Sequence, residues 1–420
     1  MIQAITLMPG ITLRCFPDNR FKQSTLSLQL VRPMRREENA LNALLPAVLL
    51  RGCAQYPDLR SITLRLDDLY GAAVGAVVRR IGDYQTTGLS CGFMEEKYAL
   101  DGDRVMQPIL EFLGQLLLDP ALEEGVFRAD YVESEKRNLI LAIESQRNDK
   151  RVYASARMTE HMCKADSFGI PRLGSVAQVS KITPQTLYDH YRKILLESPI
   201  ELFYVGAADP QTIAEYLKPL FKNLPRCPIK LPEQTAFCDG GAGEYTEEMD
   251  VAQGKLCMGF VTPNTIRSPQ FPAMQVFNTL FGAGMTCKLF MQIREKLSLC
   301  YDIGSGYHGS KGILSVSAGI DCKDQALVRA EILKQLELCQ TGHIREEELS
   351  AAKQALISQL NATHDSPAAI EGYYATAVLS GLTMAPADYK QAVEQVTKED
   401  VVAAACSLSP HTVYFLKGVQ

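Results

Sequence analysis

The sequence predicts an α+β fold that contains two homologous αβ domains, each a mainly antiparallel sheet with helices packed on one face. Three observations support this prediction. The chain has 420 residues, which is too long for one ordinary hydrophobic core. Short alternating segments typical of strands are interspersed with longer amphipathic segments typical of helices. The same order of strand, helix and helix cap also occurs twice, about half the chain apart.

Each predicted domain begins with a strand followed by an apolar helix. In the first half, residues 24–31 have a strand-like pattern, and residues 40–50 form a mostly apolar segment of helical length. In the second half, residues 254–261 and 271–281 repeat this order. We therefore expect the two pairs of elements to occupy equivalent positions in the two domains.

A helix start followed by a strand ends each half. Thr183 and Thr397 are the expected N-caps, because a threonine hydroxyl can accept a hydrogen bond from a backbone N–H of the first turn. Pro184 suits the first helical position, where no backbone donor is needed. The strands that follow are predicted at residues 201–206 and 412–418.

A linker separates the two predicted domains. Three prolines between residues 224 and 232, followed by three glycines between residues 239 and 243, indicate an exposed segment without regular structure. The predicted domains are residues 1–225 and 245–420, joined by residues 226–244. Further helices are expected at residues 103–118, 127–146, 325–339 and 346–364.

Composition and charge exclude several classes of function. The net charge of −5 and the pI near 5.8 give no basic surface for nucleic acid or an anionic membrane. No uncharged apolar run reaches the ~18 residues that a membrane span needs, and the first residues lack a signal-peptide pattern. The 12 cysteines include no Cys-x-x-Cys pair, so we expect reduced, mostly buried thiols in a cytoplasmic protein.

The histidines do not provide the usual helical zinc motif. Zinc hydrolases need three protein ligands and an open coordination position. Histidines four residues apart on a helix supply two of these ligands most simply, since they share a face. The chain has 6 histidines, and no two are four residues apart. We therefore expect neither a metal nor another cofactor in this chain.

Residues 280–301 form the most informative segment. A glycine-rich turn leads into an amphipathic helix, and a strand is expected to begin near Tyr301. This order brings Arg294 and Tyr301 to one element boundary. A guanidinium can bind carbonyl or carboxylate groups of a peptide, and a tyrosine hydroxyl can donate to an oxyanion. On these residues alone, Arg294 can instead be a surface charge paired with Glu295, and Tyr301 can be a core aromatic.

The same segment resembles a signature of the pitrilysin/insulinase family of metallopeptidases. The matching residues are Gly282-x-Gly284, Leu289-Phe290, Arg294-Glu295-Lys296 and Leu299-x-Tyr301. The resemblance implies that Arg294 and Tyr301 contact substrate and that Gly282 and Gly284 belong to a substrate loop. It also implies a half-clamshell of two domains that does not itself hold zinc.

The zinc motif of that family is degenerate in this chain. In active members, one helix carries H-x-x-E-H and a later helix carries the third ligand. The resemblance places these positions on Ala43, Pro46, Ala47 and Ala142, while Glu135 of the later helix is retained. Alanine and proline side chains offer no atom to a metal, and Pro46 is expected to distort its helix. The resemblance therefore implies that a partner chain binds the zinc.

The resemblance implies a non-catalytic subunit that contributes peptide-contacting residues to a partner's active site. The chain is similar to inactive partner proteins of Gram-positive bacteria, some of which are associated with modification of translation elongation factor P. The expected partners are a sister subunit that carries H-x-x-E-H and an extended peptide substrate, with no nucleic acid and no membrane. Homodimers in isolation are an alternative. Residues 71–78 resemble the family strand to which substrates add, although a buried strand packed on a helix explains them equally well.

Two other functions remain open at this stage. A purely structural protein of the same fold, like the core subunits of respiratory complexes, would also lack zinc ligands. An autonomous enzyme with a cysteine nucleophile would need a histidine as base, and no local motif supports one. Retention of Arg294 and Tyr301 favours the peptidase subunit, because a scaffold has no need of both.

Overall fold

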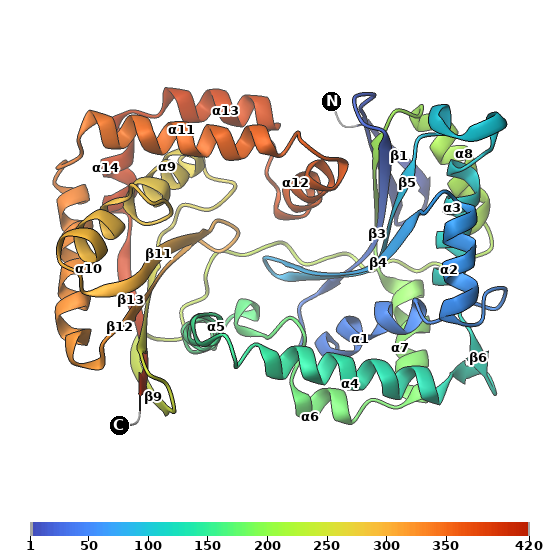
Figure 1. Cartoon of the computed structure of the whole chain (residues 1–420), viewed down its shortest axis with the longest axis horizontal. Coiled ribbons are helices and arrows are strands. Elements are labelled where there is room, and N and C mark those ends of the chain that lie inside the picture. Colours follow the sequence, from blue (N-terminus) through green and yellow to red (C-terminus); the bar gives the residue numbers. More distant parts are fainter. Residues whose placement is uncertain (1–2, 419–420) are drawn as a thin grey trace. The chain divides into compact units, whose positions relative to one another are not determined.

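The computed structural model describes residues 3–418, which form two compact units, each built around one sheet (Figure 1). Unit 1 contains the described residues through Glu144, together with Arg172–Glu233 and His364–Thr376. Unit 2 contains Ser145–Pro171, Gln234–Thr363 and the described residues from Ala377 onward. Each unit therefore includes a segment from the other half of the sequence.

The sheet of unit 1 has six strands in the order β1-β2-β8-β3-β5-β4. Neighbouring strands are antiparallel except β2 and β8, which are parallel. Strands β1 and β4 form the two edges. The strands are β1 (Gln3–Met8), β2 (Ile11–Pro17), β3 (Gln23–Pro33), β4 (Ala73–Ile81), β5 (Tyr84–Met94) and β8 (Ile200–Gly206).

The sheet of unit 2 repeats this topology. Its order is β11-β12-β10-β13-β9, and its one parallel pair is β13 with β9. The order β4-β5-β3-β8-β2 of unit 1 matches it strand for strand, including the direction of every pair, so the predicted duplication is confirmed. The strands are β9 (Gly243–Met249), β10 (Gly254–Val261), β11 (Cys300–His308), β12 (Ile313–Ile320) and β13 (Ser409–Gly418).

Helices bury one face of the unit 1 sheet. Leu26 and Leu28 of β3 share a hydrophobic core with Leu44 and Leu113 from two helices. A short hairpin, β6 (Leu122–Glu123) and β7 (Val126–Phe127), lies outside the main sheet. The helices in this part of the chain are α1 (Asn39–Leu49), α2 (Leu59–Asp68), α3 (Met106–Leu118), α4 (Ala129–Ser145), α6 (Val176–Ser180), α7 (Pro184–Glu197) and α8 (Pro210–Phe221).

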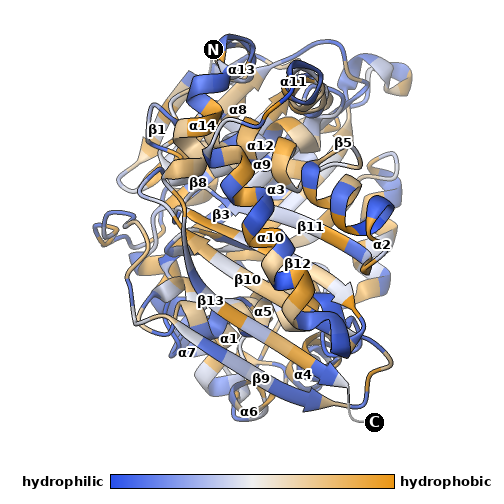
Figure 2. Cartoon of the chain, turned by 90° about the vertical axis from the view of Figure 1, so that its left-hand side faces the viewer, coloured by the Kyte–Doolittle hydropathy of each residue, from blue (hydrophilic) through white to orange (hydrophobic). Residues whose placement is uncertain are grey.

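Unit 2 has the same layered construction. Figure 2 shows hydrophobic segments in β10 and β13 and a largely hydrophilic β9 at the sheet edge. Helix α9 (Phe271–Phe281) is buried along its whole length except for Gln275, as expected for a core helix. The other helices in this part of the chain are a π-helix (Phe290–Lys296), α10 (Gln325–Gln340), α11 (Glu346–Ala362), α13 (Pro386–Gln395) and α14 (Lys398–Cys406).

One helix from the other half of the sequence lies on the second face of each sheet. Helix α5 (Lys150–Met162) packs Met158 and Met162 against Cys257 of β10. Helix α12 (Pro367–Ser380) places Glu371 on β3, where its carboxylate accepts a hydrogen bond from Ser27 at 2.5 Å. The sequence predicted helices on one face of each sheet. In the structure, the opposite face of each sheet also carries one helix, and this helix comes from the other half of the sequence.

Most predicted element boundaries agree with the structure. Thr183 and Thr397 form the capping boxes of α7 and α14, and β10 matches the predicted strand at residues 254–261. Residues 224–242 contain no helix or strand, so the linker prediction falls on irregular chain, while the domain boundaries themselves stay a prediction.

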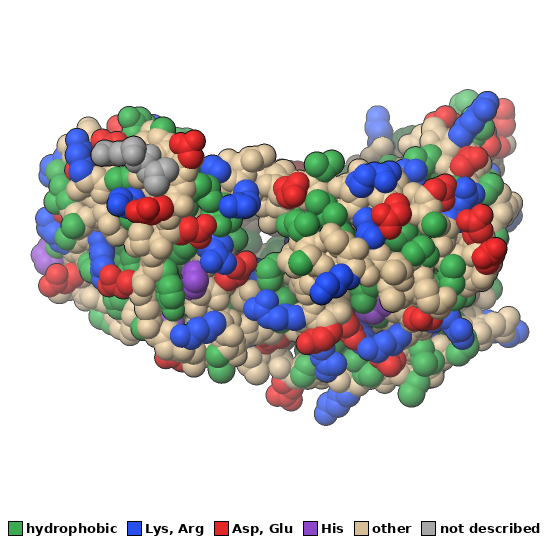
Figure 3. Space-filling view, turned by 90° about the horizontal axis from the view of Figure 1, so that it is seen from below, with side chains coloured by type: hydrophobic (Ala, Val, Ile, Leu, Met, Phe, Trp, Pro, Cys, Tyr) green, Lys and Arg blue, Asp and Glu red, His purple; other side chains and the backbone are tan. Residues whose placement is uncertain are grey.

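Two surface properties bear on the excluded functions. On the face drawn in Figure 3, acidic and basic side chains are interspersed, so this face shows no broad basic region for nucleic acid. Within residues 3–418, none of the helices combines the length and apolar character needed to cross a membrane.

Candidate functional site

Arg294 and Tyr301 line one open pocket in unit 2. The pocket has a volume of about 410 Å³. The structure therefore brings together the two residues that the sequence singled out, while their contact with substrate stays a prediction. The other lining residues are Glu295, Ser298, Leu299, Cys300, Asp321 and Asp324.

Arg294 lies on a π-helix, where the sequence predicted an ordinary amphipathic helix. The wider turn is visible in the backbone bonds, because the N–H of Leu297 donates to the carbonyl of Gln292 at 3.0 Å. The helix ends at Lys296, and two residues later Ser298 has a φ of 53°, which is unusual for a residue with a side chain. π-Helices are rare and occur frequently at functional sites. The spacing of apolar side chains did not reveal the π-helix. This helix has only seven residues, and over so short a segment the wider turn hardly changes that spacing.

Tyr301 is the extra residue of a β-bulge. Cys300 pairs with Ile320 and Asp302 pairs with Gly319, so Tyr301 has no partner on β12. A bulge re-aims a side chain at the end of a strand. The Tyr301 side chain is 65% exposed, which excludes the alternative that it is a core aromatic.

Arg294 makes only weak contacts within its own helix. Its guanidinium carbon lies 4.6 Å from the centre of the Phe290 ring, and its Nε lies 3.8 Å from a carboxylate oxygen of Glu295. The Arg294 side chain is 43% exposed, and exposed ion pairs of this length contribute little. The alternative pairing with Glu295 is therefore present, but it leaves most guanidinium donors available to a ligand.

Gly282 and Gly284 have different surroundings. A Cβ added to Gly282 would lie 2.5 Å from the hydroxyl oxygen of Ser305, and the Gly282 carbonyl accepts a hydrogen bond from the Ser305 N–H at 2.8 Å. Gly282 thus allows the end of α9 to approach β11 closely. A Cβ at Gly284 would meet nothing nearer than 3.9 Å. The role of both glycines in a substrate loop stays a prediction.

The positions that the resemblance assigns to the zinc motif carry no ligand atom. Ala43, Pro46 and Ala47 lie on α1, and Ala142 lies on α4. None of these side chains has a nitrogen, oxygen or sulfur atom to offer, so the residues present do not fit zinc. Glu135, the retained acid on α4, instead forms an ion pair with Arg51 at 3.3 Å. In the described part of the chain, no group of three or more His, Cys, Asp or Glu residues is placed to hold a metal ion.

Helix α1 continues through Pro46, although the sequence predicted a distortion there. Pro46 has no N–H to donate to the carbonyl of Asn42, four residues earlier. The hydroxyl of Thr87 on β5 donates to that carbonyl at 2.6 Å and replaces the missing helical bond. The helix is unbroken at Pro46, where a neighbouring strand supplies the donor, and a bend at this residue stays a prediction.

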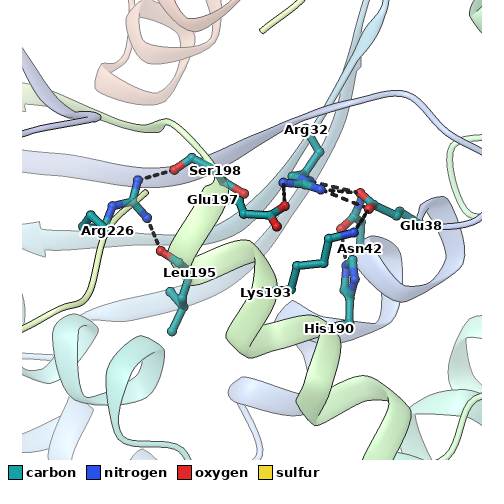
Figure 4. A network of polar contacts seen from close by, with 9 residues as sticks. All are labelled: Arg32, Glu38, Asn42, His190, Lys193, Leu195, Glu197, Ser198 and Arg226. Atoms are coloured by element: carbon teal, nitrogen blue, oxygen red, sulfur yellow. Dashed lines mark hydrogen bonds and ion pairs between the residues drawn. The ribbon is translucent and has the colours of Figure 1, made fainter. Parts of the chain in front are cut away.

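A buried polar network near α1 was missed by sequence reasoning (Figure 4). The Arg32 side chain is 2% exposed and forms ion pairs with Glu38 at 2.9 Å and Glu197 at 3.1 Å. Lys193 lies 2.6 Å from Glu38. Burial raises the pKa of Glu38, but hydrogen bonds from Lys193 and Arg32 outweigh it, so the net pKa is lowered. The sequence signal that could have revealed this network was Arg32, a charged residue within the otherwise largely apolar end of β3.

His190 belongs to the same network. Its Nε2 donates to Oδ1 of Asn42 at 2.7 Å, and Nδ2 of Asn42 donates to Oε1 of Gln85 at 2.9 Å. Burial lowers the pKa of His190 to about 4, so the ring is neutral at neutral pH. The network therefore holds α1, α7 and β5 together.

Comparisons with known proteins identify the family of this chain. A family model described as "Peptidase M16 inactive domain" matches residues 181–356. The probable inactive metalloprotease YmfF of Bacillus subtilis (strain 168) is 30% identical over 411 residues, which cover 98% of this chain and 96% of that protein. The chain belongs to the peptidase M16 family. Both matches are described as inactive, and this chain is an inactive M16 homologue.

Solved structures similar to this M16 chain have the same fold. A conserved protein from Enterococcus faecalis V583 is 27% identical and covers 100% of this chain and 99% of its own, with a TM-score of 0.91. A peptidase M16 inactive domain from Pseudomonas fluorescens is 17% identical and covers 100% of this chain and 98% of its own, with a TM-score of 0.82. At that identity the second likeness shows the fold alone.

Proposed function

We propose that this M16 protein is the non-catalytic subunit of a heterodimeric zinc metallopeptidase. A sister chain that carries H-x-x-E-H would bind zinc and activate water, and this chain would contribute groups that contact the peptide. One observation carries the proposal: Arg294 and Tyr301 share an open pocket and have exposed side chains. A cytoplasmic location and the link to elongation factor P modification belong to the same proposal.

The chemistry of the two side chains suits this role. The guanidinium of Arg294 can bind a peptide carbonyl or carboxylate, since it presents several donors in a planar fork. The hydroxyl of Tyr301 can donate to the oxyanion that forms when water attacks the scissile carbonyl. Neither residue hydrolyses a peptide without a metal-bound water or another nucleophile, which is why the proposal requires the sister chain.

The edge position of β4 supports the proposal that the substrate is an extended peptide. Residues 71–78 were interpreted either as a substrate-adding strand or as a buried one, and β4 lies at an edge of the unit 1 sheet with Ala76 exposed. Edge strands bind extended peptides through backbone hydrogen bonds.

A purely structural role is the second candidate. The contacts of Arg294 with Phe290 and Glu295 favour it, because they give the guanidinium a local function on its own helix. The two candidate functions differ in the expected effect of removing the Tyr301 hydroxyl. A structural role predicts no effect, because the side chain is exposed at the bulge, whereas a role in catalysis predicts lower activity.

A cysteine nucleophile has less support. Burial raises the pKa of the thiols of Cys91 and Cys257 to about 12, which keeps them protonated at neutral pH. Cys406 is exposed, but its sulfur is directed to the carbonyl of Gln340 at 3.6 Å.

The test is reconstitution with the zinc-bearing sister chain from the same organism. We expect the mixture to cleave a peptide library and the double variant Arg294→Ala, Tyr301→Phe to lose most of that activity. The matched control is the double variant Arg345→Ala, Tyr98→Phe, which changes two exposed residues that do not line the pocket. Full activity of the pocket variant would favour the structural role.

A further inference from the structure

The outer edge of β4 is open over only a short stretch. Ile81 pairs with Tyr84 across a two-residue turn, so the ladder bonds between β4 and β5 involve alternate residues, counted back from Ile81. The residues in between direct their N–H and C=O groups away from β5. These outward-facing residues are Val74, Ala76, Val78 and Arg80.

Arg172 closes this edge at Val78. Its Nη1 donates to the carbonyl oxygen of Val78 at 2.8 Å, which confirms that this carbonyl points outward. The backbone of Arg172 is itself fixed, because its carbonyl accepts a hydrogen bond from Nε2 of Gln85 at 2.8 Å. An added strand can therefore pair with Val74 and Ala76, but the carbonyl it would need at Val78 is already occupied.

The Arg172 side chain has binding capacity left over. It is half-buried, and within residues 3–418 it has no ion pair and no hydrogen bond other than the one to Val78. Burial lowers the pKa of this guanidinium, which is the direction expected for a cation that no carboxylate compensates. A guanidinium that uses one of its donors on a neutral carbonyl can still bind a carboxylate with the others.

We propose that Arg172 ends the open edge of β4 and binds a carboxylate of an extended peptide that pairs with Val74 and Ala76. The ligand class is a short extended segment with a carboxylate directly beyond its paired residues. If the added strand is parallel to β4, its C-terminal end lies next to Val78, so the peptide C-terminus can supply the carboxylate. If the added strand is antiparallel, an acidic side chain can supply it instead. This inference rests on the proposed peptide-binding function and adds a specificity to it.

The first experiment measures amide hydrogen exchange in β4. The N–H groups of Val74, Ala76 and Val78 point outward and have no ladder partner, so binding should slow their exchange from a fast starting rate. The probe is acetyl-Val-Ala-Val-Ala as the free acid. We expect protection of Val74 and Ala76 but not of Val78, and we expect the Arg172→Ala variant to extend protection to Val78.

The second experiment compares carboxylates. The probes are the same peptide as free acid and as amide, and amides that end in Asp or Asn. We expect one carboxylate form to bind the wild-type chain roughly tenfold tighter than its neutral counterpart, as for a charge-assisted hydrogen bond. The Arg172→Ala and Arg172→Lys variants should reduce this preference, while Arg192→Ala, an exposed arginine of the same unit, should keep it.

The outcomes separate this inference from the function on which it rests. If peptides protect Val74 and Ala76 equally well with and without a carboxylate, the role of Arg172 is wrong and peptide binding stands. If no peptide protects any β4 amide, peptide binding at this strand is wrong. The comparison of free acid with amide uses the wild-type chain, so it decides the matter even if Arg172→Ala folds poorly.

Discussion

The hydroxyl of Thr87 donates a hydrogen bond to the carbonyl oxygen of Asn42 at 2.6 Å, and this is the carbonyl that Pro46 leaves without a helical donor. Helix α1, on which the family resemblance places zinc-ligand positions, therefore continues through Pro46 with a donor from an adjacent strand. Pro46 is compatible with an unbroken helix because a single side chain satisfies the one orphaned backbone group.

This relationship predicts coupled effects of two substitutions. Thr87→Val should lower the free energy of unfolding by roughly 1–3 kcal/mol, because it leaves a buried carbonyl without a donor. In a Pro46→Ala background the restored N–H can bond to Asn42, so the same substitution should cost clearly less. Urea denaturation of the four proteins of this double-mutant cycle measures the difference. Equal costs in both backgrounds would contradict the account.

Much of the fold could be predicted from the sequence, and the failures have physical causes. Long periodic segments and capping residues gave α7, α14 and β10 because those signals are local. The exchange of α5 and α12 between units could not be predicted, since it depends on contacts between residues far apart in the chain. At the site, Arg294 and Tyr301 were singled out through the resemblance of residues 280–301 to a family signature, but the π-helix and the bulge that position them leave no mark on residue periodicity.

A second prediction concerns a fully buried ion pair in unit 2. Lys311 is 0% exposed and lies 3.0 Å from Asp166, and its ammonium also donates to the Thr235 carbonyl at 3.1 Å. Lys311→Met should lower the free energy of unfolding by about 3–5 kcal/mol, because it leaves the Asp166 carboxylate buried without its cation. Lys323→Met is the control, since Lys323 is exposed and should contribute about 0–1 kcal/mol. Similar midpoints for the two variants in thermal unfolding would be the opposing result.

A third prediction concerns pH. The pKa of His190 is lowered from 6.5 to about 4 by burial, so the unfolded chain binds a proton at this residue before the folded chain does. Stability from this residue is therefore complete above pH 6.5 and is lost as the pH falls toward 4. The loss should be about 3 kcal/mol, since one pKa unit corresponds to ~1.4 kcal/mol.

His190→Gln isolates this contribution. The glutamine keeps a hydrogen-bond donor for Asn42 but does not titrate. The difference in unfolding free energy between wild type and variant should change with pH between 6.5 and 4 and stay constant above that range. Glu38 contributes in a separate range, below its ordinary pKa of 4.5, because its folded pKa is lowered. A pH-independent difference would show that His190 is not buried as described.

A fourth prediction concerns metal. Because Ala43, Ala47 and Ala142 offer no ligand atom, the purified chain should contain no stoichiometric zinc. Elemental analysis after dialysis measures this, with an active zinc peptidase as the positive control. About one zinc per chain, removable by a chelator together with a peptidase activity, would contradict the degenerate motif.

The central claim is that Arg294 and Tyr301 act on substrate in a partner's active site, and steady-state kinetics of the Tyr301→Phe variant with the sister chain test it most directly. An oxyanion donor acts mainly in the transition state. The account predicts that kcat falls roughly 10²-fold, while KM and the affinity for the sister chain change little. Arg294→Ala should instead raise KM, since a guanidinium also holds ground-state groups. An unchanged kcat for Tyr301→Phe in a fully assembled complex would contradict the account and leave the structural role in its place.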